Sequence, residues 1–409
     1  MNKGSRISLL ISGFFHKKVD SHRMHILEIP SFFMPYGGEF CLDQAKALKE
    51  QDHKVRILSN VQLSIKHDLD GYLSLPFGRE EHVMDGITVI QSYQRGIPKV
   101  VKPNVNRWVK IVQSMFRKYV AKYGQPDVLH AHCAKWAGYA AMLISKEYGI
   151  PYVITEHLSP MSLKEEFGED LSKAWQLPML RKAYEEAAMV LPVSEELVEA
   201  TACYYGEDYR WQAVSNVIDT TLFRYQERKP FGHRPFVFCC VANFEQRKGY
   251  EVLAEAFREV CLKNKQVRLH IAGQDTDSPE CAELMAGLAG VKGYGRVSRK
   301  EVARLMYRSD ALVLPSLSEV QPLVLLEAMS TGIPVIATES TPHSLRIKGG
   351  CHIVPIGDAD ALAEAMLDMC DHYEFDGRAI SEAINRMASP EVIGEQLSEI
   401  FAEAQHHRP

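Results

Sequence analysis

Two glutamates stand eight positions apart, at Glu319 and Glu327, in a segment that follows a short apolar run. We expect Glu319 in a loop and Glu327 inside the next helix, with Pro322 in the first turn of that helix. If helical geometry covers most of the interval, the two carboxylates lie ~12 Å apart along the axis. That distance suits a nucleotide sugar, with one carboxylate at the ribose and the other at the sugar ring. The helix N-terminus between them, at Val320, Gln321, Pro322 and Leu323, would attract a diphosphate.

The alternative is that neither carboxylate binds a ligand. Glu319 would then be an acid favoured near the helix N-terminus by the helix dipole, and Glu327 would be a solvated glutamate in the middle of the helix. Against it, Glu327 is surrounded by apolar residues, where a carboxylate is rarely without a partner.

A basic loop joins an expected strand at 236–242 to an expected helix at 248–263. It contains Asn243, Arg247 and Lys248. Cations at such a loop can hold a phosphate and stabilise the negative charge that grows on a leaving diphosphate. The alternative is an ordinary surface loop.

Two shorter features follow strands of the first half. Gly37 and Gly38 precede an expected helix and would let a ligand approach the backbone closely. His157 stands at the carboxyl end of an expected strand, as a catalytic or a structural residue.

Metal chemistry has weak support. His130 and His132 share one face of a strand, but no further ligand is evident, so we interpret them as structural or cleft-lining. We interpret Asp275 and Asp277 as part of a solvated loop and Asp358 as the N-cap of a helix. We therefore expect no essential metal and no cofactor. Gly293–Ser298 resembles a dinucleotide fingerprint but lies far from an opening βαβ unit, which disfavours a nicotinamide oxidoreductase.

Composition narrows the class of protein. The 409 residues suggest two domains, and the formal charge of −5 gives no support to nucleic-acid binding. Nine scattered cysteines without a Cys-x-x-Cys motif fit a reducing compartment, so we expect a cytoplasmic protein. The weakly apolar start of the chain is poor as a secretory signal, and we expect residues 1–23 to be an extension.

Short apolar runs alternate with segments of helical period in both halves, which predicts an α/β protein with two doubly wound parallel sheets. We expect an N-terminal domain at 24–210, a C-terminal domain at 211–388 and a final helix within 389–409. The expected strands are 24–29, 55–58, 87–90, 127–131, 152–155 and 189–193, then 236–242, 267–272, 311–315, 334–337 and 352–355. The expected helices are 39–51, 104–123, 136–148, 171–188, 248–263, 299–308, 320–331, 358–373 and 390–405.

Region 95–122 has eight basic residues and no acidic one. Apolar residues recur there at helical spacing, so one face of this helix is core. The basic face could touch anionic lipid at the inner face of a membrane, or it could be solvated.

Taken in order, these motifs resemble those of GT-B glycosyltransferases of glycosyltransferase family 4. The resemblance covers Met24 to about Ala404. It rests on the glycine pair, 127–132, 155–157, 216–220, 247–249, 295–297 and the segment from Leu314 through Glu327 to Ala337. The resemblance implies retaining transfer of a sugar from a nucleoside-diphosphate sugar, usually without a metal, to a glycan or lipid-linked acceptor. We expect a role in cell-surface polysaccharide synthesis.

The resemblance also implies residue roles. Glu327 should bind the ribose, Glu319 the donor sugar, and Lys248 the diphosphate. His157 should lie near the transferred sugar, and Arg296 and Val297 should lie by the base. The glycine pair should admit donor phosphates or the acceptor, and the last helix should cross back onto the first domain.

Asn243 departs from the family's frequent arginine, so Arg247 is expected to supply part of that charge. Val320 departs from a frequent glycine. A nucleotide-sugar epimerase of the same fold and a catalytically silent nucleotide-sugar-binding partner stay open as alternatives.

Overall fold

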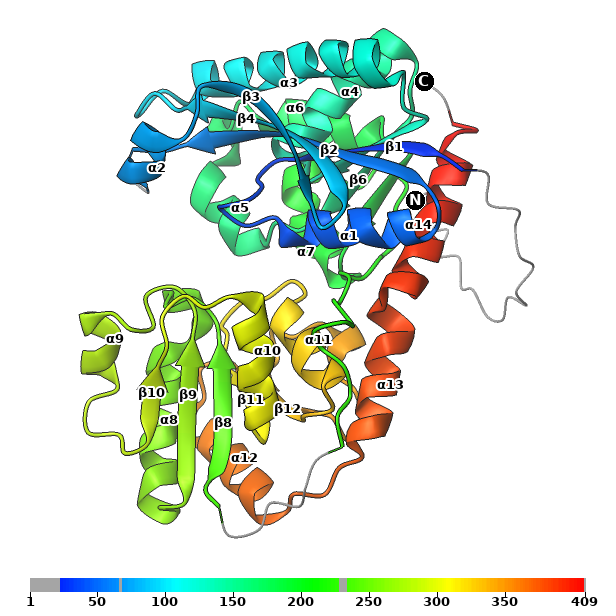
Figure 1. Ribbon diagram of the computed structural model, residues 1–409. Coiled ribbons are helices and arrows are strands. Elements are labelled where there is room, and N and C mark those ends of the chain that lie inside the picture. Colours follow the sequence, from blue (N-terminus) through cyan, green and yellow to red (C-terminus); the bar gives the residue numbers. More distant parts are fainter. Residues whose placement is uncertain (1–22, 66–67, 228–233, 408–409) are drawn as a thin grey trace, which may run out of the picture.

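The computed structural model describes residues 23–65, 68–227 and 234–407, so nearly all of the expected N-terminal extension lies outside the described residues. Two sheets, one in each half of the chain, are stacked end to end, and a long pair of helices runs along both (Figure 1). The α/β class with two Rossmann-like sheets is confirmed.

The first sheet has the strand order β3-β4-β2-β1-β5-β6-β7. All neighbouring strands are parallel except β3, which is antiparallel to β4. The strands are β1 (His25–Pro30), β2 (Lys54–Leu63), β3 (Gly78–Met84), β4 (Ile87–Arg95), β5 (Val128–His132), β6 (Tyr152–Glu156) and β7 (Met189–Pro192). The helices are α1 (Glu39–Glu50), α2 (Leu69–Ser74), α3 (Val101–Tyr123), α4 (Tyr139–Tyr148), α5 (Pro160–Phe167), α6 (Leu177–Glu185) and α7 (Glu196–Tyr205).

The second sheet is parallel throughout, with the order β10-β9-β8-β11-β12-β13. Its strands are β8 (Phe236–Val241), β9 (Val267–Ala272), β10 (Val291–Gly293), β11 (Ala311–Leu314), β12 (Val335–Thr338) and β13 (Cys351–Val354). Its helices are α8 (Tyr250–Lys263), α9 (Pro279–Leu284), α10 (Arg299–Arg308), α11 (Leu323–Ser330), α12 (Ala359–Asp371) and α13 (Gly377–Ala388). Strands buried on both faces account for the continuous apolar runs in the sequence.

The last helix, α14 (Pro390–Ala404), returns to the first half. Ser389 caps it by accepting a hydrogen bond from the Val392 N–H, and Pro390 opens its first turn. Its buried residues Ile393, Leu397 and Phe401 belong to the same apolar cluster as β1 and α1. The expected crossing of the final helix is therefore confirmed.

Several expected elements differ from the structure. The expected helix 320–331 is wrong at its start, because α11 begins at Leu323 and Pro322 is its extended N-cap. Helical rise therefore covers only the second half of the interval between Glu319 and Glu327. The expected helix 171–188 is shorter, since α6 begins at Leu177 after one 3-10 turn. Within the described residues, no helix is both long and apolar enough to span a membrane.

Candidate active site

The candidate site lies at the boundary between the two halves of the chain. In Figure 1 the strands β8 and β9 point toward the first half, so the loops that follow them line its boundary. Two cavities lie between the halves. A smaller one of about 260 Å³ is lined by Ser194 and Glu196 from the first half and by Glu319, Val320 and His343 from the second. A larger one of about 610 Å³ is lined by Glu39 and Lys46 against Arg296 and Val297.

Lys248 and Glu319 form an ion pair, with Nζ 2.5 Å from Oε1. Their loops follow β8 and β11, which are neighbours in the sheet. Gly249 makes this approach possible, because its φ is +69° and a Cβ there would lie 2.1 Å from the Pro315 carbonyl oxygen. The Leu317 N–H also donates to the Arg247 carbonyl at 2.8 Å. The structure thus brings together a cation and a carboxylate that are distant in sequence.

The other basic-loop residues are arranged differently. Arg247 Nε lies 2.8 Å from Glu245 Oε2, so its charge is partly neutralised locally. The Asn243 side chain accepts a hydrogen bond from the Gln274 N–H and holds two loops together. Neither contact reaches the Lys248–Glu319 pair.

Glu327 is buried and paired with Arg299, whose Nε lies 3.0 Å from Glu327 Oε1. The same guanidinium contacts Asp43 of α1, with Nη1 2.6 Å from Oδ2. Burial raises the pKa of Glu327 to about 7, although Arg299 opposes the shift. Arg299 therefore joins the expected ribose-binding carboxylate to the first half of the chain.

Lys46 extends this network. Its Nζ lies 3.9 Å from Asp43, 3.5 Å from Asp219 and 3.6 Å from Asp85. Since Asp43, Lys46, Asp85, Asp219 and Arg299 all line the larger cavity, that cavity has strongly charged walls.

Arg296 also links the halves, because its guanidinium donates to the Pro35 carbonyl oxygen at 3.2 Å. Gly37 and Gly38 follow Pro35 after one intervening residue and have φ of +95° and +88°. A Cβ at Gly38 would lie 2.6 Å from the Phe32 carbonyl oxygen, so the turn before α1 requires glycine there.

Gln321 has a role that the sequence did not predict. Its Oε1 accepts a hydrogen bond from the Asn216 N–H at 2.7 Å, which ties the start of α11 to the segment between the sheets. Val320 instead lines the smaller cavity, and Leu323 packs on the apolar core of the second half.

His157 follows β6 and stacks on Phe40 of α1, with ring centroids 3.7 Å apart. Glu156 fixes the backbone there, because its Oε1 accepts from the N–H groups of His157 and Leu158. Burial lowers the pKa of His157 well below its usual value, and His132 and His130 add to the shift. The ring is therefore neutral near pH 7.

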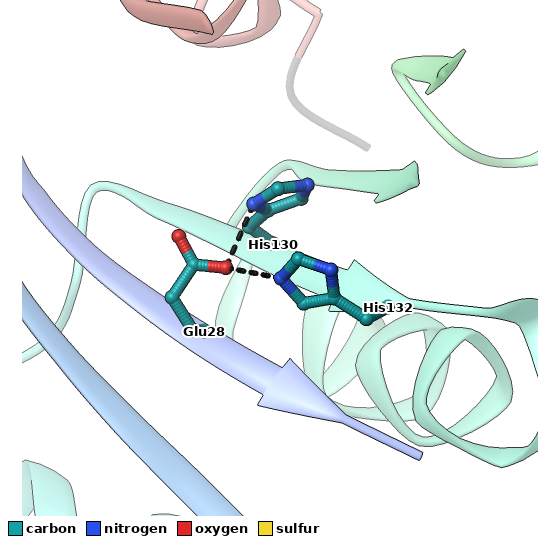
Figure 2. A group of neighbouring side chains, drawn as sticks. All are labelled: Glu28, His130 and His132. Carbon is teal, nitrogen blue, oxygen red and sulfur yellow. Dashed lines mark hydrogen bonds and ion pairs between the residues drawn. The ribbon is translucent and has the colours of Figure 1, made fainter. Parts of the chain in front are cut away.

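A buried cluster lies behind His157 (Figure 2). Glu28 Oε2 lies 2.7 Å from His130 Nδ1 and 2.8 Å from His132 Nε2. Burial would raise the pKa of Glu28, but the two histidines outweigh it and lower the pKa to about 2. Glu28 is thus a third potential metal ligand beside the two histidines, although no sequence pattern connected it to them. A hydrogen bond from His132 and a close ion-pair contact with His130 already give the ionised carboxylate two partners.

The contact between Glu28 and the two histidines could not be predicted from sequence, because Glu28 lies 102 positions before His130. The two residues become neighbours only when β1 pairs with β5. A carboxylate inside an apolar strand is the signal that could have identified it. No comparable sequence pattern marked Asp43 or Arg299 as part of the site.

Among the described residues, the two Asp-x-Asp sequences, which contain Asp275 and Asp358, form no hydrogen bond or ion pair with the Lys248–Glu319 pair or with the Glu28 cluster. Asp358 caps α12 by accepting from the Ala361 N–H, as expected. Asp275 and Asp277 are exposed.

Comparison with known proteins decides the family. Residues 37–222 match the model described as Glycosyltransferase Family 4, and residues 235–372 match the model described as Glycosyl transferases group 1. The chain belongs to glycosyltransferase family 4. As a family 4 enzyme of the retaining GT-B type, it transfers sugar from a nucleotide sugar.

Among its relatives, the Bacillus subtilis protein named as the teichuronic acid biosynthesis glycosyltransferase TuaC is 28% identical, covering 70% of this chain and 72% of the relative. Sucrose-phosphate synthase from Thermosynechococcus elongatus has a TM-score of 0.72 at 18% identity, covering 92% of this chain and 98% of the other. Anabaena HepE in complex with UDP and glucose has a TM-score of 0.67 at 18% identity, covering 93% and 100%.

Proposed function

We propose that this family 4 enzyme transfers a hexose from a nucleoside-diphosphate sugar to a glycan or lipid-linked acceptor in cell-surface polysaccharide synthesis, without an essential metal. The observation that carries the proposal is the Lys248–Glu319 pair beside a cavity lined from both halves. In this proposal Lys248 receives the diphosphate while Glu319 turns to the hydroxyls of the donor sugar. The polysaccharide context is supported by the name of the Bacillus subtilis relative.

Glu327 binds the ribose in this proposal, and Arg296 and Val297 flank the base at the larger cavity. Gly37 and Gly38 admit the phosphates or the acceptor, and His157 lies by the transferred sugar. Arg247 and Asn243 shape the phosphate loop. The negative charge on the departing diphosphate is stabilised by Lys248 and by the N-terminus of α11.

The test is a transfer assay with a panel of UDP- and GDP-sugars, preceded by thermal-shift screening, since a bound donor raises apparent stability. Transfer should continue in EDTA at the rate of an untreated control. Activity that is lost with chelator and restored by magnesium or manganese contradicts metal independence. Release of free epimerised nucleotide sugar without an acceptor favours the epimerase instead.

Peripheral membrane contact through region 95–122 belongs to the same proposal. Apolar side chains are exposed within this basic region at Ile97 and Val101, and outside it at Phe77, whose ring centroid lies 3.7 Å from the Arg95 guanidinium. Apolar and basic side chains together suit an anionic lipid surface. Sedimentation with anionic vesicles, compared with neutral ones, tests this contact.

A further inference from the structure

Glu28, His132 and His157 form a chain of side chains that leads from the sheet interior to the candidate site. His132 Nε2 lies 2.8 Å from Glu28 Oε2, and His132 Nδ1 lies 3.4 Å from His157 Nε2. Figure 2 shows the Glu28 carboxylate facing both histidine rings of β5. His132 uses a different ring nitrogen for each of its two contacts. The nitrogen that carries its proton therefore determines which ring donates in the contact between His132 and His157.

The direction of these hydrogen bonds follows from Glu28. An ionised carboxylate only accepts, so the proton of the first contact is on His132 Nε2. The His132 ring is buried, and burial disfavours its charged form, so the ring is neutral and carries one proton only. His132 Nδ1 is therefore an acceptor, and His157 Nε2 must donate to it.

We propose that Glu28 and His132 are positioning residues that hold His157 as the Nε2–H tautomer, leaving His157 Nδ1 as the one acceptor nitrogen of its ring. This proposal rests on the proposed function, in which His157 lies by the transferred sugar. An acceptor nitrogen there receives a hydrogen bond from a sugar hydroxyl, whereas the other tautomer would present a donor. Phe40 restrains the plane of the same ring from its face.

The geometry gives the chain an internal control. His130 contacts the same Glu28 oxygen, but its Nε2 lies 2.7 Å from Thr155 Oγ1 and not near His157 Nε2. Losing the Thr155 hydroxyl leaves the path from Glu28 through His132 to His157 intact.

The experiment is ¹⁵N NMR of imidazole-labelled enzyme, which distinguishes protonated from unprotonated ring nitrogens without using activity. We expect a single Nε2–H form of His157 in the wild type and in Thr155→Val. We expect a mixture of tautomers in His132→Phe and Glu28→Gln, with kcat/KM for the donor about tenfold lower, the value of one hydrogen bond.

His157 as Nδ1–H in the wild type overturns the proposal without any variant having to fold. A tautomer unchanged in folded His132→Phe also overturns it. A changed tautomer with unchanged kcat/KM supports the hydrogen-bonded chain and contradicts the placement of His157 at the transferred sugar.

Discussion

At the scale of single residues, burial decides which charges are available to a ligand. Lys248 and Glu319 have side-chain exposures of 13% and 7% and neutralise each other. Glu327 is neutralised by Arg299 instead. A donor must therefore exchange contacts with these groups, because each already has a partner.

Replacing Glu327 by glutamine should weaken donor binding about 10- to 100-fold, since hydrogen bonds to charged groups contribute roughly 1.5–3 kcal/mol. The carboxylate, whose pKa burial raises to about 7, is the stronger acceptor. Wild-type affinity should therefore fall as the pH drops below 7, and the Glu327→Gln variant should lack this dependence. Calorimetry at pH 6 and pH 8 measures both, and equal wild-type affinities would contradict the assigned role.

Replacing Lys248 by alanine should lower kcat by about 100-fold while weakening donor binding less. Charge on the leaving diphosphate grows as the bond breaks, so the cation contributes most in the transition state. Lys263→Ala, at an exposed position of α8, is the control. Equal losses of kcat and affinity would indicate uniform binding instead.

At the scale of elements, the strands were easier to predict than the helices. Buried parallel strands are continuous apolar runs, and most expected ranges agree with the structure within a few residues. Exposed β3 and the amphipathic helix α13 lack such runs. Ile380 and Ile384 mark only one narrow buried stripe on α13, and that pattern was too weak to predict a helix.

For the site, sequence order revealed which residues follow strands, but not which side chains meet. Lys248 and Glu319 were both predicted, yet their pairing depends on β8 and β11 being neighbours. The Arg299 bridge depends on how α10 approaches α1, which no local pattern records. Pairings across elements therefore had to come from the structure.

Gly249→Ala should disrupt the loop that carries Lys248. The substitution places a side chain in the left-handed region, at ~1–2 kcal/mol, and adds contact with the Pro315 carbonyl. Gly149→Ala is a matched control, because Gly149 has nearly the same φ but nothing within 4 Å. Urea unfolding should show the larger loss for Gly249→Ala, and activity should fall only there.

Arg299→Ala should destabilise the enzyme by about 3 kcal/mol, because Asp43 and Glu327 would stay buried without their shared cation. That value is at the low end for buried pairs, since the Arg299 side chain is 25% exposed. Asp43→Ala should be less harmful in the Arg299→Ala background than alone. Simple additivity in this double-mutant cycle would rule out the network, and Arg304→Ala on the same helix is the control.

At the scale of the whole molecule, the two halves are held together by α13 and α14 as well as by the charged contacts. Phe401 of α14 packs against His130 edge to face, with ring centroids 5.0 Å apart. The last helix thus supports the buried cluster of the first half.

Phe401→Ala should lower the free energy of unfolding by about 3–5 kcal/mol, since it leaves a cavity against β5. Thermal and urea unfolding measure the loss. If the cavity loosens His130, the His130 NMR signals should broaden, whereas Leu262→Ala, at an exposed position, should change neither measurement.

The return of α14 also constrains how the chain is made. The apolar cluster of β1 and α1 is completed only by residues 393–404. At about 5–20 residues per second, the ribosome needs roughly 10–40 s to add the ~200 residues between α7 and the end of α14. During that time the nascent first half presents an uncovered apolar surface, to which ribosome-associated chaperones can bind until α14 has been made.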